Sequence, residues 1–405
     1  MSKMDELLKG VEVEWKTLGE VGELVRGNGL PKSDFTNSGV PAIHYGQIYT
    51  HYKTYTIDTL SFVSKETAEK LKKVNKGDVI ITNTSENLED VGKALVYLGE
   101  IQAVTGGHAT IFKPSKEIIG KFFAYFTQTV SFFNQKIKYA KGTKVVDLSA
   151  NDLSKIIIPV PPISVQERIV SILDKFAELT AELTAELTAR KKQYEYYREQ
   201  LLSFEEGEVE WKMLGEVGEF RRGKRFVKDD IVSTGIPCIH YGEMYTYYGN
   251  WAYKTKSFLS KELVQSKKLR FAEKGDVLIV AAGETIEDIG RGTAWLGDEG
   301  VIFHDACFSY RSPINPKYVS YFTRTKQFHD QIKKYISSGK ISAINAKGLE
   351  KVIIPIPPPE TQERIVSILD KFDTLTNSIS KGLPREIELR QKQYEYYRDK
   401  LLTFS

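Results

Sequence analysis

Residues 156–204 read IIIPVPPISVQERIVSILDKFAELTAELTAELTARKKQYEYYREQLLSF. After the Pro-rich turn, apolar residues recur at spacings of three and four, which places them on one face of a helix. No Gly or Pro occurs between Val165 and Leu202. The sequence therefore predicts one unbroken helix about 57 Å long, at ~1.5 Å per residue. So long an apolar stripe requires a partner against which it can pack.

The sequence repeats this stretch near its end, and the repeat can supply the partner. Residues 362–372 are identical to 166–176, and residues 392–398 are identical to 192–198. The second copy also contains Gly382-Leu383-Pro384, which predicts a break or kink in its helix. We expect a coiled coil whose apolar positions are Ile169, Ile172, Phe176, Leu183 and Leu187 in the first copy, and Ile365, Ile368 and Phe372 in the second.

The globular parts of the chain are repeated as well. EVEWKTLGEVGELVRG at residues 12–27 returns as EVEWKMLGEVGEFRRG at 208–223, and IHYGQIYT at 43–50 returns as IHYGEMYT at 239–246. Two large copies of this kind differ from the many short units of a solenoid. Runs of β-branched residues predict strands in each copy, and residues 121–138 predict one helix.

The repeat divides the chain into four segments. We expect an α+β fold with globular domains at residues 1–155 and 205–351, and with helical regions at 156–204 and 352–405. Inside the globular domains, matched segments alternate with segments that barely resemble each other. The matched segments suggest a shared task, such as binding two copies of one partner. The divergent segments suggest two different targets.

The composition is that of an ordinary globular protein. The net charge of +4 permits nucleic-acid binding without requiring it. No apolar run approaches the length of a membrane span, and the first ten residues do not resemble a signal peptide. The two cysteines, Cys238 and Cys307, fit a reducing compartment. These features predict a cytoplasmic protein.

No catalytic motif is evident in the sequence. Asn315-Pro316-Lys317-Tyr318 lacks the second proline of the turn that holds the target amine in amino-methyltransferases. No Walker A loop is present, and His44 and His240 have no further metal ligands at a defined spacing. Two alternatives stay open at this point, namely a self-contained DNA adenine methyltransferase with divergent motifs and a coiled-coil scaffold protein.

Several polar and basic segments are candidates for contacts with DNA. Phosphate groups are bound by Lys, Arg, Ser, Thr and free backbone amides, and Asn is suited to an adenine edge. For each segment a structural role is the alternative: a solvated loop, a capped turn, or a histidine bonded to the backbone. The predicted DNA-binding residues are Arg26, His44, Tyr45, Asn83, Thr84, Ser85, Lys141, Thr143 and Lys144 in the first copy, and Arg221, Arg222, Lys224, His240, Tyr241, Ser337, Ser338 and Lys340 in the second.

The pattern P-x-P-P-x-x-x-Q-E-R-I-V-x-I-L-D-K-F at 159–176, with its near copy at 355–372, resembles the specificity subunit of type I restriction–modification systems. The duplicated W-K-x-L-G-E-V segments extend this resemblance over the whole chain. The Thr-Ala-Glu-Leu unit, present at 180–183 and 184–187, resembles the type IC subfamily.

The resemblance implies two target recognition domains separated by two antiparallel helices. It also implies a bipartite double-stranded DNA site, two methyltransferase (M) subunits along the helical regions, and restriction (R) subunits that join through them. The chain itself is then expected to be non-catalytic and without a cofactor. S-adenosylmethionine, ATP and Mg²⁺ are expected only on the partner subunits.

Overall fold

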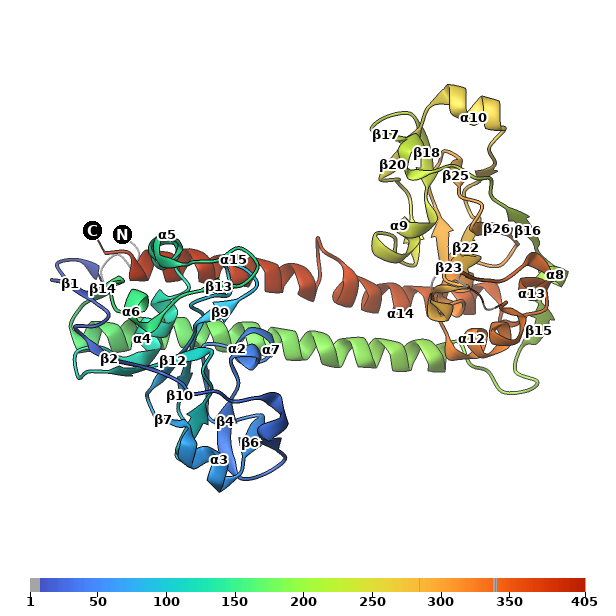
Figure 1. Cartoon of the computed structure of the whole chain (residues 1–405). Coiled ribbons are helices and arrows are strands. Elements are labelled where there is room, and N and C mark those ends of the chain that lie inside the picture. The colour runs from blue at the N-terminus through green and yellow to red at the C-terminus, as the bar shows by residue number, and fades with distance from the viewer. Residues whose placement is uncertain (1–7, 284, 338, 340, 405) are drawn as a thin grey trace. The chain divides into compact units, whose positions relative to one another are not determined.

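The repeat in the sequence is also a repeat in three dimensions (Figure 1). The computed structural model describes residues 8–283, 285–337, 339 and 341–404. The chain divides into two units. Unit 1 holds the described residues up to Thr184 together with those from Ile387 onward, and unit 2 holds Ala185–Glu386. The mixed α+β composition and the two repeated domains confirm the predicted fold class.

Each unit contains two five-stranded sheets with one shared strand order. In unit 1 the central sheet runs β2 (Gly22–Arg26), β12 (Ala109–Pro114), β8 (Val79–Thr82), β10 (Ala94–Tyr97) and β5 (Tyr55–Thr56). The outer sheet runs β3 (Phe35–Thr36), β6 (Ser61–Val63), β4 (Val40–Ile43), β11 (Ala103–Thr105) and β7 (Lys72–Val74). Two short ribbons complete the unit, β1 (Glu14–Thr17) with β14 (Ile157–Val160) and β9 (Thr84–Ser85) with β13 (Val146–Asp147).

Unit 2 repeats these sheets strand by strand. Its central sheet runs β16 (Glu219–Arg222), β26 (Cys307–Arg311), β22 (Val277–Val280), β24 (Gly292–Trp295) and β19 (Trp251–Ala252). Its outer sheet runs β17 (Ile231–Val232), β20 (Ser257–Leu259), β18 (Ile236–Ile239), β25 (Val301–Phe303) and β21 (Phe271–Ala272). The matching ribbons are β15 (Glu210–Met213) with β28 (Ile353–Ile356) and β23 (Ala282–Gly283) with β27 (Ser342–Ala343).

Strand β8 is buried along its whole length because both faces of the central sheet are covered. Val79 and Ile81 join the core that includes helix α4 (Gly120–Phe126) and helix α5 (Val130–Tyr139), whereas Ile80 joins a second core beneath α2 (Tyr45–Thr50). The remaining short helices of unit 1 are α3 (Lys65–Lys70) and α6 (Ala150–Leu153). Those of unit 2 are α8 (Leu214–Val217), α9 (Tyr241–Thr246), α10 (Lys261–Lys267), α11 (Pro316–Phe322), α12 (Lys326–Ile332) and α13 (Ala346–Glu350).

The prediction of one helix over residues 121–138 is wrong, since the segment forms the separate helices α4 and α5. The hydroxyl of Thr127 donates to the Ala124 carbonyl, and that of Thr129 donates to the Phe126 carbonyl and caps α5. Such bonds compete with continuation of a helix. The break rotates α5, so Val130 is 61% exposed instead of sharing the apolar face of α4.

The first helical region is the single helix that the sequence predicts, α7 (Ile163–Leu201), with 39 residues. The second region is broken where Gly382-Leu383-Pro384 predicts it. Helix α14 (Pro359–Asn377) has 19 residues and α15 (Leu383–Leu402) has 20, so together they have as many helical residues as α7. At Gly382 an added Cβ would lie 2.3 Å from the Thr374 carbonyl oxygen, so the loop needs glycine there.

Within each unit the two helical regions pack antiparallel. In unit 1, Phe176 stacks on Tyr397 with ring centroids 5.5 Å apart, while Ile169 shares a core with Leu401. In unit 2, Phe372 stacks on Tyr197 at 5.4 Å, and Ile365 shares a core with Leu202. Of the predicted coiled-coil positions, Ile169 and Ile365 are buried, and the half-buried ones are Ile172, Phe176, Leu183, Leu187, Ile368 and Phe372.

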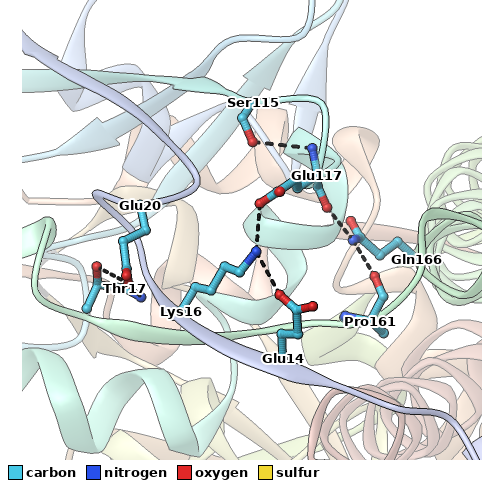
Figure 2. A network of polar contacts seen from close by, with 8 residues as sticks. All are labelled: Glu14, Lys16, Thr17, Glu20, Ser115, Glu117, Pro161 and Gln166. Atoms are coloured by element: carbon cyan, nitrogen blue, oxygen red, sulfur yellow. Dashed lines mark hydrogen bonds and ion pairs between the residues drawn. The ribbon is translucent and has the colours of Figure 1, made fainter.

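The start of each helical region is hydrogen-bonded to the globular part. The side chain of Gln166 donates to the carbonyls of Glu117 and Pro161, each at 2.8 Å (Figure 2). It also accepts from the Ile119 amide at 2.8 Å. On the neighbouring ribbon, the Lys16 ammonium pairs with Glu14 at 2.7 Å and with Glu117 at 3.0 Å (Figure 2). The buried amide of Gln166 thus fixes the angle at which the helix leaves the domain.

Candidate nucleic-acid interface

His44 ends strand β4 and caps helix α2. Its Nδ1 accepts from the Gly46 amide at 3.1 Å, and its own amide donates to the Gln47 side chain at 3.2 Å. His240 repeats this arrangement at α9, where its Nδ1 accepts from the Gly242 amide at 3.3 Å. Since Nδ1 is the acceptor, the ring proton is assigned to Nε2. These bonds favour the structural interpretation of both histidines, and contact with DNA stays a prediction.

Each capping histidine belongs to a cluster of rings, which we call the His–Tyr cluster. In unit 1 it consists of His44, Tyr45 and His108, with Tyr45 lying 4.5 Å from the first ring and 4.8 Å from the second. In unit 2 it consists of His240, Tyr241 and His304, with centroid separations of 4.6, 5.0 and 4.7 Å. The predicted DNA-binding residues do not include the second histidine of either cluster, yet the fold brings it beside them.

A matched arginine lies beside each His–Tyr cluster. Arg26 donates through Nε to the Gly107 carbonyl at 3.3 Å, and Arg222 donates through Nε to the Asp305 carbonyl at 2.9 Å. Both bonds orient the guanidinium group from strand β2 or β16 and leave other N–H groups available for an anion. The neighbouring Arg221 is tied instead to Glu219 at 2.9 Å, and alternation along β16 points it to the other face.

The short ribbons β9–β13 and β23–β27 connect the predicted loops to the clusters. Thr84 on β9 lies 2.9 Å from His108 Nδ1 through its hydroxyl, and the hydroxyl of Tyr49 donates to the Thr84 carbonyl. In unit 2, Tyr245 donates to the Ala282 carbonyl at 3.1 Å. Tyr49 and Tyr245 stand at matched places in the repeated IHYG segments, a signal that could have identified them from the sequence.

The predicted basic loops lie directly before the second strand of each ribbon, β13 or β27. Residues Lys141 and Asp147 exchange two backbone hydrogen bonds of 2.9 and 2.7 Å, and Ser337 and Ala343 do the same at 2.9 and 3.0 Å. Thr143 and Lys144 are exposed at the tip of the first loop. Lys141 is exposed as well and lies 3.6 Å from Asp152. The predicted residues Ser338 and Lys340 lie outside the described residues.

Unit 2 has a cleft of about 650 Å³ beside its His–Tyr cluster. The cleft unites residues from five separate segments of the unit, and its walls carry both guanidinium groups and aromatic rings. Predicted residues among its lining are Arg222, His240 and Tyr241, joined by Arg225, Tyr245, His304 and Ile341, which the prediction left out. Lys224, by contrast, donates to the Lys267 carbonyl at 3.4 Å.

Two predicted residues are less accessible than a base contact requires. Asn83 is fully buried, and its Oδ1 accepts from Thr110 at 2.8 Å. Burial of this side chain beneath β8 and β12 argues against its reading a base edge. Ser85 is also buried and accepts from the Asn87 amide at 3.4 Å, which makes it part of a capped turn.

The capping histidines His44 and His240 are neutral near pH 7. Burial, together with a smaller effect of the nearby His304, lowers the pKa of His240 to about 4. Burial likewise lowers the pKa values of His304 and His44 below their ordinary range. The positive charge of the candidate interface therefore comes from the arginine and lysine side chains around it, and the capping histidines contribute neutral N–H groups. Among the described residues, no three His, Cys, Asp or Glu side chains are placed to hold a metal ion.

Comparisons with known proteins identify the family of the chain. A family described as "Type I restriction modification DNA specificity domain" matches residues 10–190 and 206–389. The chain belongs to this family. The specificity subunit is 34% identical to a putative type I restriction enzyme specificity subunit of Haemophilus influenzae, over 99% of this chain and 98% of that protein.

Two further similarities cover almost the full length of the specificity subunit. It is 34% identical to the EcoR124I/EcoR124II specificity subunit of Escherichia coli, over 100% of this chain and 97% of that protein. A solved structure concerned with complex assembly and conformational transition of the type I R-M system has a TM-score of 0.63 at 18% identity. The match covers 98% of both chains and shows a shared fold. Among the described helices of the specificity subunit, none has the length and hydropathy of a membrane span.

Proposed function

We propose that this specificity subunit recognises a bipartite DNA site, with one half-site bound by each unit and a non-specific spacer between them. The target recognition domains are residues 1–155 and 205–351, and the helical regions are 156–204 and 352–405. The observation that carries this proposal is the repetition of one scaffold around two different interfaces. Strand order, the capping histidines and the matched arginines recur, whereas the residues around them differ.

The differences lie where a reader of bases would need them. In unit 2 the ring of Phe226 packs against His240 and His304, with centroids 5.9 and 5.2 Å apart, where unit 1 has Leu30 at the matched position. Thr84 on β9 is replaced by Ala282 on β23. A hydroxyl group can hydrogen-bond to a base edge and a methyl group cannot, so this exchange alters the pattern of bases accepted. The shared arginines contact phosphates, which position the protein without reading sequence.

The helical regions bind the partners. Two modification subunits dock on the repeated helices, since the repeated segment 166–176 exposes the same side chains as its copy at 362–372. These are Glu167, Arg168, Ser171 and Lys175, and Glu363, Arg364, Ser367 and Lys371. Restriction subunits join through that complex. The chain itself carries out no reaction, and S-adenosylmethionine, ATP and Mg²⁺ bind to the partner subunits in the cytoplasm.

Exchange of one recognition domain tests the proposal. Residues 1–155 are replaced by the matching domain of a relative with another recognition site, and the complex with its modification subunits is used to methylate host DNA. Mapping the methylated adenines is expected to show one changed half-site, one retained half-site and an unchanged spacer. Exchange of residues 205–351 is the matched control, and it is expected to alter the other half-site. A change in both half-sites after a single exchange would refute independent reading.

A further inference from the structure

The loop 141–145 is shaped by its backbone, which leaves its side chains free for contacts with a ligand. Gly142 has a φ of +105°, and an added Cβ would lie 2.0 Å from the Val145 carbonyl oxygen. The two backbone hydrogen bonds between Lys141 and Asp147 close the loop at its base. All five residues of the loop are exposed. The loop is thus a fixed turn whose outward side chains do not hold it together.

One of these outward side chains is apolar. Val145 is 58% exposed, while the next residue, Val146, begins strand β13 and is buried. The matched residue of unit 2, Ile341, is 63% exposed and precedes the buried Ser342 of β27. Alternation along a strand explains why one side chain of each pair points inward. It does not explain why the outward one is a β-branched apolar residue in both units.

A short part of the loop sequence is retained between the two copies although its surroundings have changed. The segments KGTKVVDL at 141–148 and SSGKISAI at 337–344 agree in type only at the lysine, the following β-branched residue and the final aliphatic residue. The last of these, Leu148 or Ile344, is buried and belongs to the core of its unit. Lys144, Val145 and Ile341 are exposed and have no such role, so they have a task outside the fold.

The surroundings of Ile341 indicate what that task is. Its side chain lines the 650 Å³ cleft of unit 2, together with Arg222, Arg225 and Tyr241. An apolar group beside guanidinium groups and aromatic rings matches the chemistry of a DNA base step, with its apolar stacked faces between two phosphates. A partner protein is the less suitable occupant, because the lysine before each apolar residue favours phosphate.

We propose that Val145 and Ile341 are wedges, each of which inserts between two stacked base pairs of its half-site and partly unstacks them. Lys144, which precedes the first wedge, holds the adjacent phosphate. A wedge of this kind selects base steps that unstack easily, so it contributes to specificity without hydrogen-bonding to a base edge. This inference rests on the proposed recognition of DNA by both units.

The test uses the complex of the specificity and modification subunits on a duplex with its mapped methylation site. The fluorescent analogue 2-aminopurine, which emits more strongly when unstacked, replaces single unmethylated adenines or their neighbours in each half-site. The wild-type complex is expected to raise the emission at one step in each half-site. Val145→Ala is expected to abolish the rise in one half-site only, and Ile341→Ala in the other. Each change is expected to weaken binding about fivefold, from the loss of buried apolar surface.

Three variants test whether the emission depends on an apolar side chain at this one position. Val145→Ile keeps an apolar β-branched group and is expected to retain the fluorescence, whereas Val145→Ser is expected to lose it. Ile57→Ala removes an apolar residue that is 60% exposed elsewhere in unit 1 and is expected to change nothing. A complex that binds its site with no rise in emission at any step overturns the wedge while leaving DNA recognition intact. Loss of modification-subunit binding in Val145→Ala would also overturn it, and failure of the wild-type complex to bind DNA would refute the proposed function itself.

Discussion

Tyr125 on α4 donates a 2.6 Å hydrogen bond to Asp174 on α7, and the same carboxylate pairs with Lys121 at 2.8 Å. Unit 2 has the same contacts from Tyr321 and Lys317 to Asp370, both at 2.7 Å. Burial, reinforced by the adjacent carboxylate, raises the pKa of Tyr125 above its ordinary range. The globular part of each unit is therefore joined to its helix by a charged, mostly buried contact in addition to apolar packing.

Replacement of Asp174 by Ala is expected to destabilise unit 1 strongly. The change leaves the Lys121 ammonium and the Tyr125 hydroxyl without their acceptor in a site where the ion pair is only 18% and 20% exposed. Breaking a buried pair by removing one partner costs about 3–5 kcal/mol, and the partial exposure here favours the lower end of that range. Denaturant unfolding followed by circular dichroism measures the loss.

The exposed pair between Lys76 and Glu100 is the matched control for that experiment. Its side chains are 57% and 80% exposed, and such surface pairs contribute ~0–1 kcal/mol. Glu100→Ala is therefore expected to leave the unfolding midpoint almost unchanged. Equal decreases in the free energy of unfolding for Asp174→Ala and Glu100→Ala would show that the contact on α7 stabilises the protein no more than an exposed ion pair does.

The buried histidines predict a stability that falls in acid. The pKa of His240 is about 4 in the folded chain, mainly because of burial, whereas an unfolded histidine has a pKa of about 6.5. Between these values the unfolded chain binds a proton that the folded chain does not. The free energy of unfolding thus decreases as pH falls from about 6.5 to 4, by up to ~1.4 kcal/mol per pH unit for this one residue.

The variant His240→Asn measures this contribution directly. Asparagine is a good helix cap and does not titrate, so the backbone bond at α9 can be kept. Stability near pH 7.5 is expected to change little, because the wild-type ring is neutral there in both states. The slope of the free energy of unfolding against pH between 6.5 and 4 is expected to become shallower by up to ~1.4 kcal/mol per pH unit, which corresponds to one proton fewer taken up on unfolding. An unchanged slope would assign the acid sensitivity to other groups, such as His304.

The sequence was most informative where one periodic pattern governs a long segment. Helix α7 and the break before α15 follow from the spacing of leucines and from Gly382 and Pro384, which act locally. The break between α4 and α5 escaped prediction because Thr127 and Thr129 decide it through bonds to specific carbonyls. Periodicity carries no information about such bonds.

The interface was predicted as a set of segments, but their contacts could not be predicted. His108 lies far from Tyr45 in the sequence, and only the parallel pairing of β11 with β4 brings the two regions together. Asn83 looked like a polar residue after a strand, yet its burial depends on the neighbouring strand that carries Thr110. Long-range pairing of strands therefore decides which polar residues reach the surface.

Removal of the Lys144 ammonium is expected to weaken DNA binding through the loss of one phosphate contact. For Lys144→Ala the slope of log affinity against log salt should fall in magnitude by about one unit, since each neutralised phosphate contributes ~0.9 for duplex DNA. Lys76→Ala removes the same charge before the start of β8, at the end of that strand opposite Thr84, and should leave the slope unchanged. Equal slopes for Lys144→Ala and the wild type would place the loop away from the phosphates.

Insertion of Thr-Ala-Glu-Leu after Leu187 is expected to lengthen the spacer of the DNA site. Leu183 and Leu187 are half-buried while Glu182 and Glu186 are exposed, so a third unit continues the same stripe. Thr184 also donates to the Thr180 carbonyl at 2.7 Å, a bond that each added unit can repeat. The insertion should therefore preserve α7, which circular dichroism and assembly with the modification subunits would verify.

The expected change in spacer length follows from comparing the geometry of the α-helix with that of the DNA double helix. Four residues lengthen α7 by ~6 Å and rotate its far end by ~40°, whereas one base pair adds ~3.4 Å and about 35°. Length alone suggests nearly two pairs, but rotation suggests one. A rotational mismatch moves a side chain off its base edge, while a few ångströms of extra length can be absorbed by tilt of the helix. Mapping of methylated adenines should therefore show a spacer one base pair longer.

The control insertion Thr-Ala-Glu turns the far end of α7 by about 300° and breaks the apolar stripe, so it should abolish recognition. An unchanged spacer in the four-residue variant would show that α7 does not set the distance between half-sites.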